Sequence, residues 1–229
     1  MFSADRTPED PEKAAAFTRA LGRLPMFPLR NVVLLPNTFL PLHIFEPRYR
    51  KLTKDVLEGD KLLAMAFQLG EDHEYDGPPE VAPIAGVGEI VLAQALPDGR
   101  YNLVLRGRAR VHIDRELSGD GPYRMIQATE IPDDPPRSVV DLLDAEVSLR
   151  ALTVGLADAL PEGGDLLKQV VAAQSTPAAL VDVVASTLIA DPVVRQRLLE
   201  MTDVNRRISL VSSEIAEMTA RLSSPATLN

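Results

Sequence analysis

The chain has 229 residues, of which 33 are acidic and 24 are basic, so that its formal net charge is −9. This acidic balance argues against binding of nucleic acid or of an anionic membrane by the whole surface. Apolar residues make up 45% of the chain, which is typical of a globular protein, and the absence of cysteine excludes disulfides, thiol catalysis and cysteine metal sites.

The first 23 residues are expected to form an N-terminal arm. Residues 14–20 are compatible with a short helix that ends at Gly22, but the segment as a whole is polar and charged. It does not resemble a signal peptide, and no apolar run in the chain approaches the roughly 20 residues of a membrane span. The sequence therefore indicates a soluble cytoplasmic protein with no membrane partner.

Residues 24–58 carry the clearest local pattern. An apolar run bounded by prolines, residues 24–36, predicts a buried strand, and a second strand is predicted up to Phe45. Pro47 then suits the first position of a helix, where its missing N–H costs nothing, and Glu46 places a carboxylate at the positive end of the helix dipole. Gly59 is expected to end this helix.

The apolar residues of that helix recur on one side, which predicts the face that it buries: Tyr49, Leu52, Val56 and Leu57. The short apolar run 61–68 predicts another strand, covered on both faces. Residues 70–80 form a loop by composition, in which His73 lies among acidic residues. Their spacing matches neither an EF-hand nor a helical zinc motif, so a solvated loop is favoured over a cation site and no metal site is predicted.

Residues 84–131 show a β pattern. Two strands flank a Pro-Asp-Gly turn at 97–99, which predicts a hairpin. Along residues 105–114 apolar residues alternate with polar ones, which places three arginines on one outward face about 7 Å apart: Arg106, Arg108 and Arg110. The proline-rich residues 132–136 then break the pattern and predict a short, stiff linker.

From Ser138 onward the apolar period is helical. Ser138 and Thr176 are predicted N-caps, and Pro177 fits the first position of a helix. Spacings of three and four mark one face of the first helix: Leu143, Val147, Arg150, Ala151 and Val154. Four or five helices are expected between residues 138 and 222, and together they predict a bundle.

Two stretches resemble a known family. Residues 26–36, which begin Met-Phe-Pro-Leu-Arg and end Val-Leu-Leu-Pro, resemble the opening of the N-terminal, substrate-recognition domain of Lon proteases. Residues 42–50, Leu-His-Ile-Phe-Glu-Pro-Arg-Tyr-Arg, are similar to the version in stand-alone Lon-domain proteins and in the Lon-like domain of cereblon. Residues 86–90, 105–110 and 195–207 match further local patterns of the family, in the same order.

The resemblance implies an α+β fold. Lon N-terminal domains have a partly open β-barrel of the pseudouridine-synthase-and-archaeosine (PUA-like) type, followed by a helical part. The expected organisation is therefore an arm over residues 1–23, a β-rich PUA-like subdomain over residues 24–132, and an all-α helical bundle over residues 138–222.

The resemblance also implies a function without chemistry. The chain would recognise polypeptide segments or unfolded and damaged proteins, without ATP or another cofactor, and a separate protease is a candidate partner. The family signature falls on four candidate binding residues: Phe45, Glu46, Arg48 and Tyr49. Helix capping explains Glu46 and burial explains Tyr49 without any ligand, so a structural corner is the favoured interpretation.

Catalytic patterns are missing from the sequence. An intact Lon protease needs an ATPase module and a Ser–Lys peptidase module, and the chain contains no Gly-x-x-x-x-Gly-Lys-Ser/Thr motif. Lys168 is the only lysine after Lys61, and it lies in a helical pattern without a glycine-rich serine turn. His43 is expected to be a satisfied core or edge histidine, and His112 has no nucleophile motif beside it. No catalytic residue is predicted, and the chain is not expected to be an enzyme.

Two other functions remain open at this point. Arg106, Arg108 and Arg110 would form an anion-binding face, as in an RNA- or nucleotide-binding PUA-like module. No aromatic residues alternate with these arginines, and carboxylates such as that of Glu89 are available to pair with them, so a solvated, ion-paired face is favoured and nucleic acid is not the expected partner. An enzyme that acts on a small molecule has support only from the acidic loop and His112.

Overall fold

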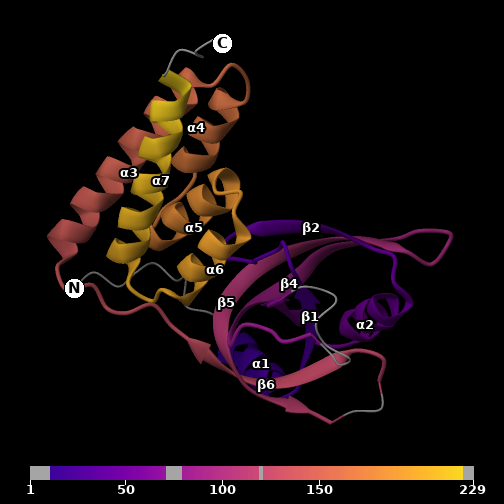
Figure 1. The fold of residues 1–229 in the computed structure, drawn as a ribbon. Coiled ribbons are helices and arrows are strands. Elements are labelled where there is room, and N and C mark those ends of the chain that lie inside the picture. Colours follow the sequence, from indigo (N-terminus) through magenta and orange to yellow (C-terminus); the bar gives the residue numbers. More distant parts are fainter. Residues whose placement is uncertain (1–10, 71–78, 119–120, 224–229) are drawn as a thin grey trace. The chain divides into compact units, whose positions relative to one another are not determined.

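The computed structural model describes residues 11–70, 79–118 and 121–223, and the protein forms two compact units. The first unit is Met1–Pro132 and the second is Asp133–Asn229, so the boundary falls at the start of the proline-rich segment 132–136. Strands dominate the first unit and helices the second (Figure 1).

In the described part of the first unit, two helices accompany a six-stranded sheet. Their bounds are α1 Pro11–Leu21, β1 Leu24–Leu29, β2 Phe39–Ile44, α2 Pro47–Glu58, β3 Leu62–Phe67, β4 Ile84–Ala95, β5 Tyr101–Leu117 and β6 Arg124–Ile131. The strand order is β2-β5-β4-β3-β1-β6, and β5 pairs with β6 as well. Five strands therefore close into a ring, while β2 lies at an edge. The predicted α+β class with a partly open barrel is confirmed.

The long strand β5 makes this closure possible. Along one edge it pairs antiparallel with β4. Along the other edge, residues 101–106 pair with β2 and residues 110–117 pair with β6. One strand thus belongs both to the barrel and to a three-stranded extension, β2-β5-β4, which can be followed in Figure 1.

The predicted strand at residues 24–36 is too long, because β1 ends at Leu29. Leu34 and Leu35 are nevertheless buried, since their segment passes directly over the backbone of β4 and β5. A Cβ atom on Gly86 would lie 2.0 Å from the Leu34 carbonyl oxygen, and one on Gly107 would lie 2.1 Å from the Leu35 oxygen. Burial therefore comes from a crossing that only glycine permits, and not from pairing in the sheet.

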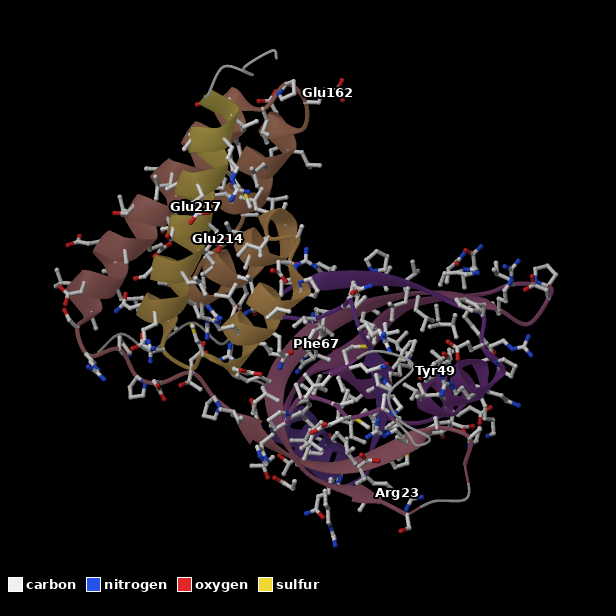
Figure 2. All side chains as sticks on the ribbon, in the orientation of Figure 1. Arg23, Tyr49, Phe67, Glu162, Glu214 and Glu217 are labelled. Carbon is white, nitrogen blue, oxygen red and sulfur yellow. The ribbon has the colours of Figure 1, made fainter. Side chains whose placement is uncertain are left out.

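Helix α2 has the bounds that the sequence predicts. Three of the four predicted residues, Tyr49, Leu52 and Val56, are buried, and Leu57 is partly buried against the same hydrophobic cluster; Tyr49 is labelled in Figure 2. The rings of Tyr49 and Phe27 lie with their centroids 4.0 Å apart. Gly59 follows the last helical residue with a φ of −107°, so the helix ends there without a left-handed glycine.

The described part of the second unit contains five helices: α3 Val139–Ala159, α4 Gly164–Ala172, α5 Pro177–Leu188, α6 Pro192–Glu200 and α7 Val204–Ser223. The predicted N-caps are confirmed, since Ser138 Oγ accepts from the Asp141 backbone N–H and Thr176 Oγ1 accepts from that of Ala179, each at 3.2 Å. None of the described helices is both long and apolar enough to cross a membrane.

Helix α3 runs beside α7 in the bundle (Figure 1). Its buried side includes Leu149 and Leu156. The apolar residues whose spacing marks the helix in the sequence lie on its other side and are exposed: Leu143, Val147, Ala151 and Val154. Helix α3 is therefore apolar on two sides, of which the bundle covers one.

A buried arginine anchors the start of the helical unit. Arg207 of α7 is 1% exposed, and its guanidinium contacts Asp133 Oδ1 at 2.6 Å and Asp182 Oδ1 at 3.5 Å. Burial alone would lower the pKa of Arg207, but the two carboxylates outweigh it and raise that pKa. The next residue, Asp134, accepts a hydrogen bond from Thr202 Oγ1 at 2.7 Å. The first linker residues are thus fixed to the bundle.

Candidate functional site

The three-stranded extension presents a face made of three cross-strand rows. The register places Phe39, Arg106 and Glu89 in the first row, Pro41, Val104 and Leu92 in the second, and His43, Asn102 and Gln94 in the third. Residues opposite one another in a sheet point to the same side. We call these nine residues the outer sheet face. Its opposite side carries Leu105 and Ile90, which are buried in one hydrophobic cluster with Phe27 and Tyr49.

The first row is held together by ion pairs. Glu89 Oε2 accepts from Arg106 and from Arg108, each at 2.8 Å. Burial would raise the pKa of Glu89, but these hydrogen bonds outweigh it and hold that pKa below its usual value. The carboxylate is therefore ionised at neutral pH, and it is shared by two cations.

The third row forms a chain of hydrogen bonds. His43 Nδ1 lies 2.7 Å from Asn102 Oδ1, which can only accept, so this ring nitrogen is the donor. Asn102 in turn donates to Gln94 Oε1 at 3.4 Å, and an Arg100 nitrogen lies 3.3 Å from His43 Nε2. His43 is thus a hydrogen-bonded edge histidine, as the sequence suggests, and its ring is engaged by neighbours.

Apolar side chains fill the centre and the ends of the outer sheet face. Leu92 is 60% exposed, Phe39 at the start of β2 is 63% exposed, and Phe45, which directly follows β2, is 62% exposed. They are the exposed phenylalanines of the described chain. The ring of Phe45 stacks near that of His43, with 6.3 Å between centroids. Apolar side chains that share one face and have polar groups at their border are typical of an interaction site.

The structure separates the four signature residues. Phe45 is exposed beside the outer sheet face, near His43, whereas Tyr49 is on the buried side of α2 and its pKa is raised by that burial. Glu46 makes no side-chain cap to α2 and instead accepts from Arg48 Nε at 2.9 Å. Arg48 also lies over the Tyr49 ring, 4.5 Å from its centroid. Glu46 is the N-cap residue of α2, as the sequence predicts, although its side chain pairs with Arg48 and makes no cap hydrogen bond.

The expectation of three arginines on one outward face is also wrong. Arg108 has no partner in the β4 register, because Gly88 lies opposite Gly107 and Val87 lies opposite Ala109. This bulge shifts the alternation by one residue, so Arg110 lies on the side of the sheet opposite to Arg106 and is 3% exposed. Arg106 and Arg108 remain near each other and share the carboxylate of Glu89.

Of the other candidate residues, Lys168 and His112 each contact a carboxylate. Lys168 Nζ contacts Asp158 Oδ1 at 2.5 Å, and this hydrogen bond raises the pKa of Lys168. A lysine that acts as a general base needs the opposite shift. His112 Nδ1 lies 3.0 Å from Asp114 Oδ1 on an exposed strand. Within residues 11–70, 79–118 and 121–223 no group of three metal-ligating side chains comes together. His73 and its acidic neighbours lie outside the described residues.

Sequence reasoning missed most of the outer sheet face. Phe39, Leu92 and Val104 lie in three separate strands, and their shared position depends on the register of β2 and β4 against β5. The Pro-Asp-Gly turn could have aligned β4 with β5, but no local signal places β2 beside them.

Comparison with known proteins supports this description of the fold. A sequence model of the ATP-dependent protease La (LON) substrate-binding domain matches residues 23–217. The chain is 31% identical over 201 residues to Lon protease 2 of Syntrophobacter fumaroxidans, covering 83% of this chain and 24% of that protein. It is 31% identical over 193 residues to the Lon protease of Roseiflexus castenholzii, covering 83% and 23%. The chain thus spans about a quarter of the length of the curated relatives it matches.

Solved structures show the same fold. The N-terminal domain of the Mycobacterium avium complex Lon protease superposes with a TM-score of 0.68 at 19% identity, covering 85% of this chain and 98% of that one. The Lon N-terminal domain protein from Xanthomonas campestris gives a TM-score of 0.55 at 23% identity, covering 83% and 97%. The chain therefore belongs to the family of the ATP-dependent protease La (LON) substrate-binding domain.

Proposed function

We propose that this chain binds extended segments of unfolded or damaged proteins through the outer sheet face, and that it performs no chemistry on them. The observation that carries the proposal is a set of three exposed apolar side chains, Phe39, Leu92 and Phe45. The polar side chains of the neighbouring rows already form hydrogen bonds and ion pairs within each row. A ligand that covers these side chains would remove apolar area from water without breaking those ion pairs and hydrogen bonds. The family's description as a substrate-binding domain supports the same assignment.

Contact through side chains fits this site better than strand addition at its edge. β2 contains Pro41. Proline has no N–H to donate, so within a sheet it occurs in edge strands with its nitrogen facing the free edge. An added strand would lack a donor in the middle of its ladder, which is one way in which proteins block edge pairing. The two phenylalanines and Leu92 would instead act as anchors for apolar side chains of varied sequence.

The expected affinity is modest. Burying the remaining exposed part of three such side chains is worth on the order of 1–2 kcal/mol each, and association itself costs at least about 4 kcal/mol. Additional contacts along an extended segment would bring the Kd to about 10–100 µM. Weak binding of this kind suits a module that must accept many sequences and release them.

The test is binding of a reduced, carboxymethylated protein such as α-lactalbumin, followed by fluorescence anisotropy. The double variant Phe45→Ser/Leu92→Ser should weaken binding at least about fivefold, since each loss of 1.4 kcal/mol is tenfold. The matched control is Leu166→Ser, which changes an equally exposed apolar residue of α4 and should leave Kd within about twofold. Wild-type protein that shows no binding at about 100 µM, or binding that the double variant leaves intact, would refute the proposal.

Degradation of the bound protein is then carried out by another polypeptide, such as a separate protease. The chain has no Gly-x-x-x-x-Gly-Lys-Ser/Thr motif, and the relatives named Lon protease are about four times longer. Incubation of the pure chain with casein, with and without ATP, should therefore yield no fragments. The arginines give weaker support for an RNA-binding function, because Arg106 and Arg108 are paired with Glu89 and Arg110 is buried.

A further inference from the structure

Helix α3 carries a second exposed apolar surface, far in sequence from the outer sheet face. Its members follow one side of the helix and are Val140, Leu143, Val147, Ala151 and Val154, which we call the α3 ridge. Val147, at the centre, is 66% exposed. The opposite side of α3 is also apolar, and it is packed in the bundle. A helix that is apolar on both sides is typically covered on both sides.

The α3 ridge is uninterrupted by charge. Between Val140 and Val154 it extends about 21 Å at 1.5 Å per residue. Arg150, whose backbone lies near it, turns toward Glu146 at 2.7 Å and toward the carbonyl oxygens of Val171 and Gln174. The guanidinium is therefore engaged with α3 and the segment around α4, and it leaves the ridge aliphatic.

The spacing of the ridge is symmetric about Val147. Leu143 and Ala151 lie four residues to either side of it, and Val140 and Val154 lie seven residues to either side. A second copy packed antiparallel about a two-fold axis at Val147 would set Leu143 on Ala151 and Val140 on Val154. A large side chain would then meet a small one, and the same patch would serve both copies, as a two-fold interface requires. Parallel packing would instead set Leu143 on Leu143 and Ala151 on Ala151.

From this self-complementarity we propose that the α3 ridge is a contact between two copies of this chain, with their α3 helices antiparallel. The ridge has neither aromatic anchors nor hydrogen-bonding groups for an extended client, in contrast to the outer sheet face. Asp144 borders the ridge, and antiparallel packing keeps it about 9 Å along the axis from the Asp144 of the second copy. That separation is close to the Debye length at physiological salt, so salt screens the repulsion.

The dimer should be weak and dependent on concentration. One helix ridge covers less than the roughly 800 Å² per partner that a standard interface buries. Each copy also carries a formal net charge of −9, so association should strengthen as salt rises. This surface is separate from the outer sheet face, so the inference does not depend on the proposed function.

Cysteine crosslinking tests both the contact and its direction, and the chain contains no native cysteine to interfere. Under mild oxidation Val147→Cys should form a disulfide dimer at least about fivefold faster than Leu166→Cys, an exposed control on α4. Val154→Cys alone should crosslink no faster than the control, since its copy lies about 21 Å away. A mixture of Val140→Cys and Val154→Cys should crosslink readily.

Sedimentation velocity from about 10 to 500 µM provides a second measurement. Wild-type protein should sediment faster at high concentration and in added salt, and Val147→Glu should remain monomeric. Wild-type protein that stays monomeric throughout, or Val147→Cys that reacts no faster than the control, would overturn the contact. Rapid crosslinking of Val154→Cys with itself would overturn the antiparallel arrangement.

Discussion

The buried cluster around Arg207 allows a quantitative test of what stabilises the helical unit. Replacing Arg207 with Met would remove the guanidinium that lies 3.5 Å from Asp182, which is 2% exposed, and would break the contact to Asp133. Removal of one partner of a buried ion pair costs about 3–5 kcal/mol, because the remaining charge stays desolvated. For a unit of roughly 100 residues each kcal/mol lowers Tm by about 4–8 °C. We therefore expect Arg207→Met to lower the Tm of the helical transition by at least about 12 °C.

The assay is thermal and urea unfolding followed by circular dichroism at 222 nm. The matched control is Arg206→Met, the preceding and exposed arginine of α7, which should change stability by less than about 0.5 kcal/mol. Adding Asp182→Asn to Arg207→Met removes the buried carboxylate charge and should restore at least about 1.5 kcal/mol. A loss below about 1 kcal/mol for Arg207→Met, or no recovery in the double variant, would show that the cluster is not an essential charge pair.

Two further predictions concern the first unit. Gly107→Ala should destabilise it by at least about 2 kcal/mol, because the new Cβ would lie 2.1 Å from the backbone oxygen of Leu35, whereas Gly121→Ala, with no atom within 4 Å of its new Cβ, should be nearly neutral in urea unfolding. The pKa of Glu89 is lowered in the folded state, so its contribution to stability is present above its unfolded pKa and disappears as pH falls through the folded value. Glu89→Gln should therefore reduce stability at pH 7 and flatten the loss of stability between about pH 5 and 3. Equal pH profiles for variant and wild type would contradict this assignment.

Local signals in the sequence determined several elements correctly. Helix α2 begins at Pro47 and ends before Gly59, and α3 and α5 begin after the predicted caps Ser138 and Thr176. These features depend on backbone restrictions and hydrogen bonds within a few residues, which any chain segment carries with it. The change of apolar period near residue 138 likewise separated strands from helices, because two and 3.6 residues per repeat are distinct periods.

Tertiary structure decided which of the apolar and charged residues are covered. Leu34 is buried by a crossing over Gly86, and Arg110 is buried because a bulge at Arg108 reverses its side of the sheet. The α3 ridge is exposed because the bundle covers the other apolar side of the helix. The outer sheet face exists only through the register of three strands. In each case the deciding partner lies far away along the chain, and periodicity within one segment carries no information about which distant surface will meet it.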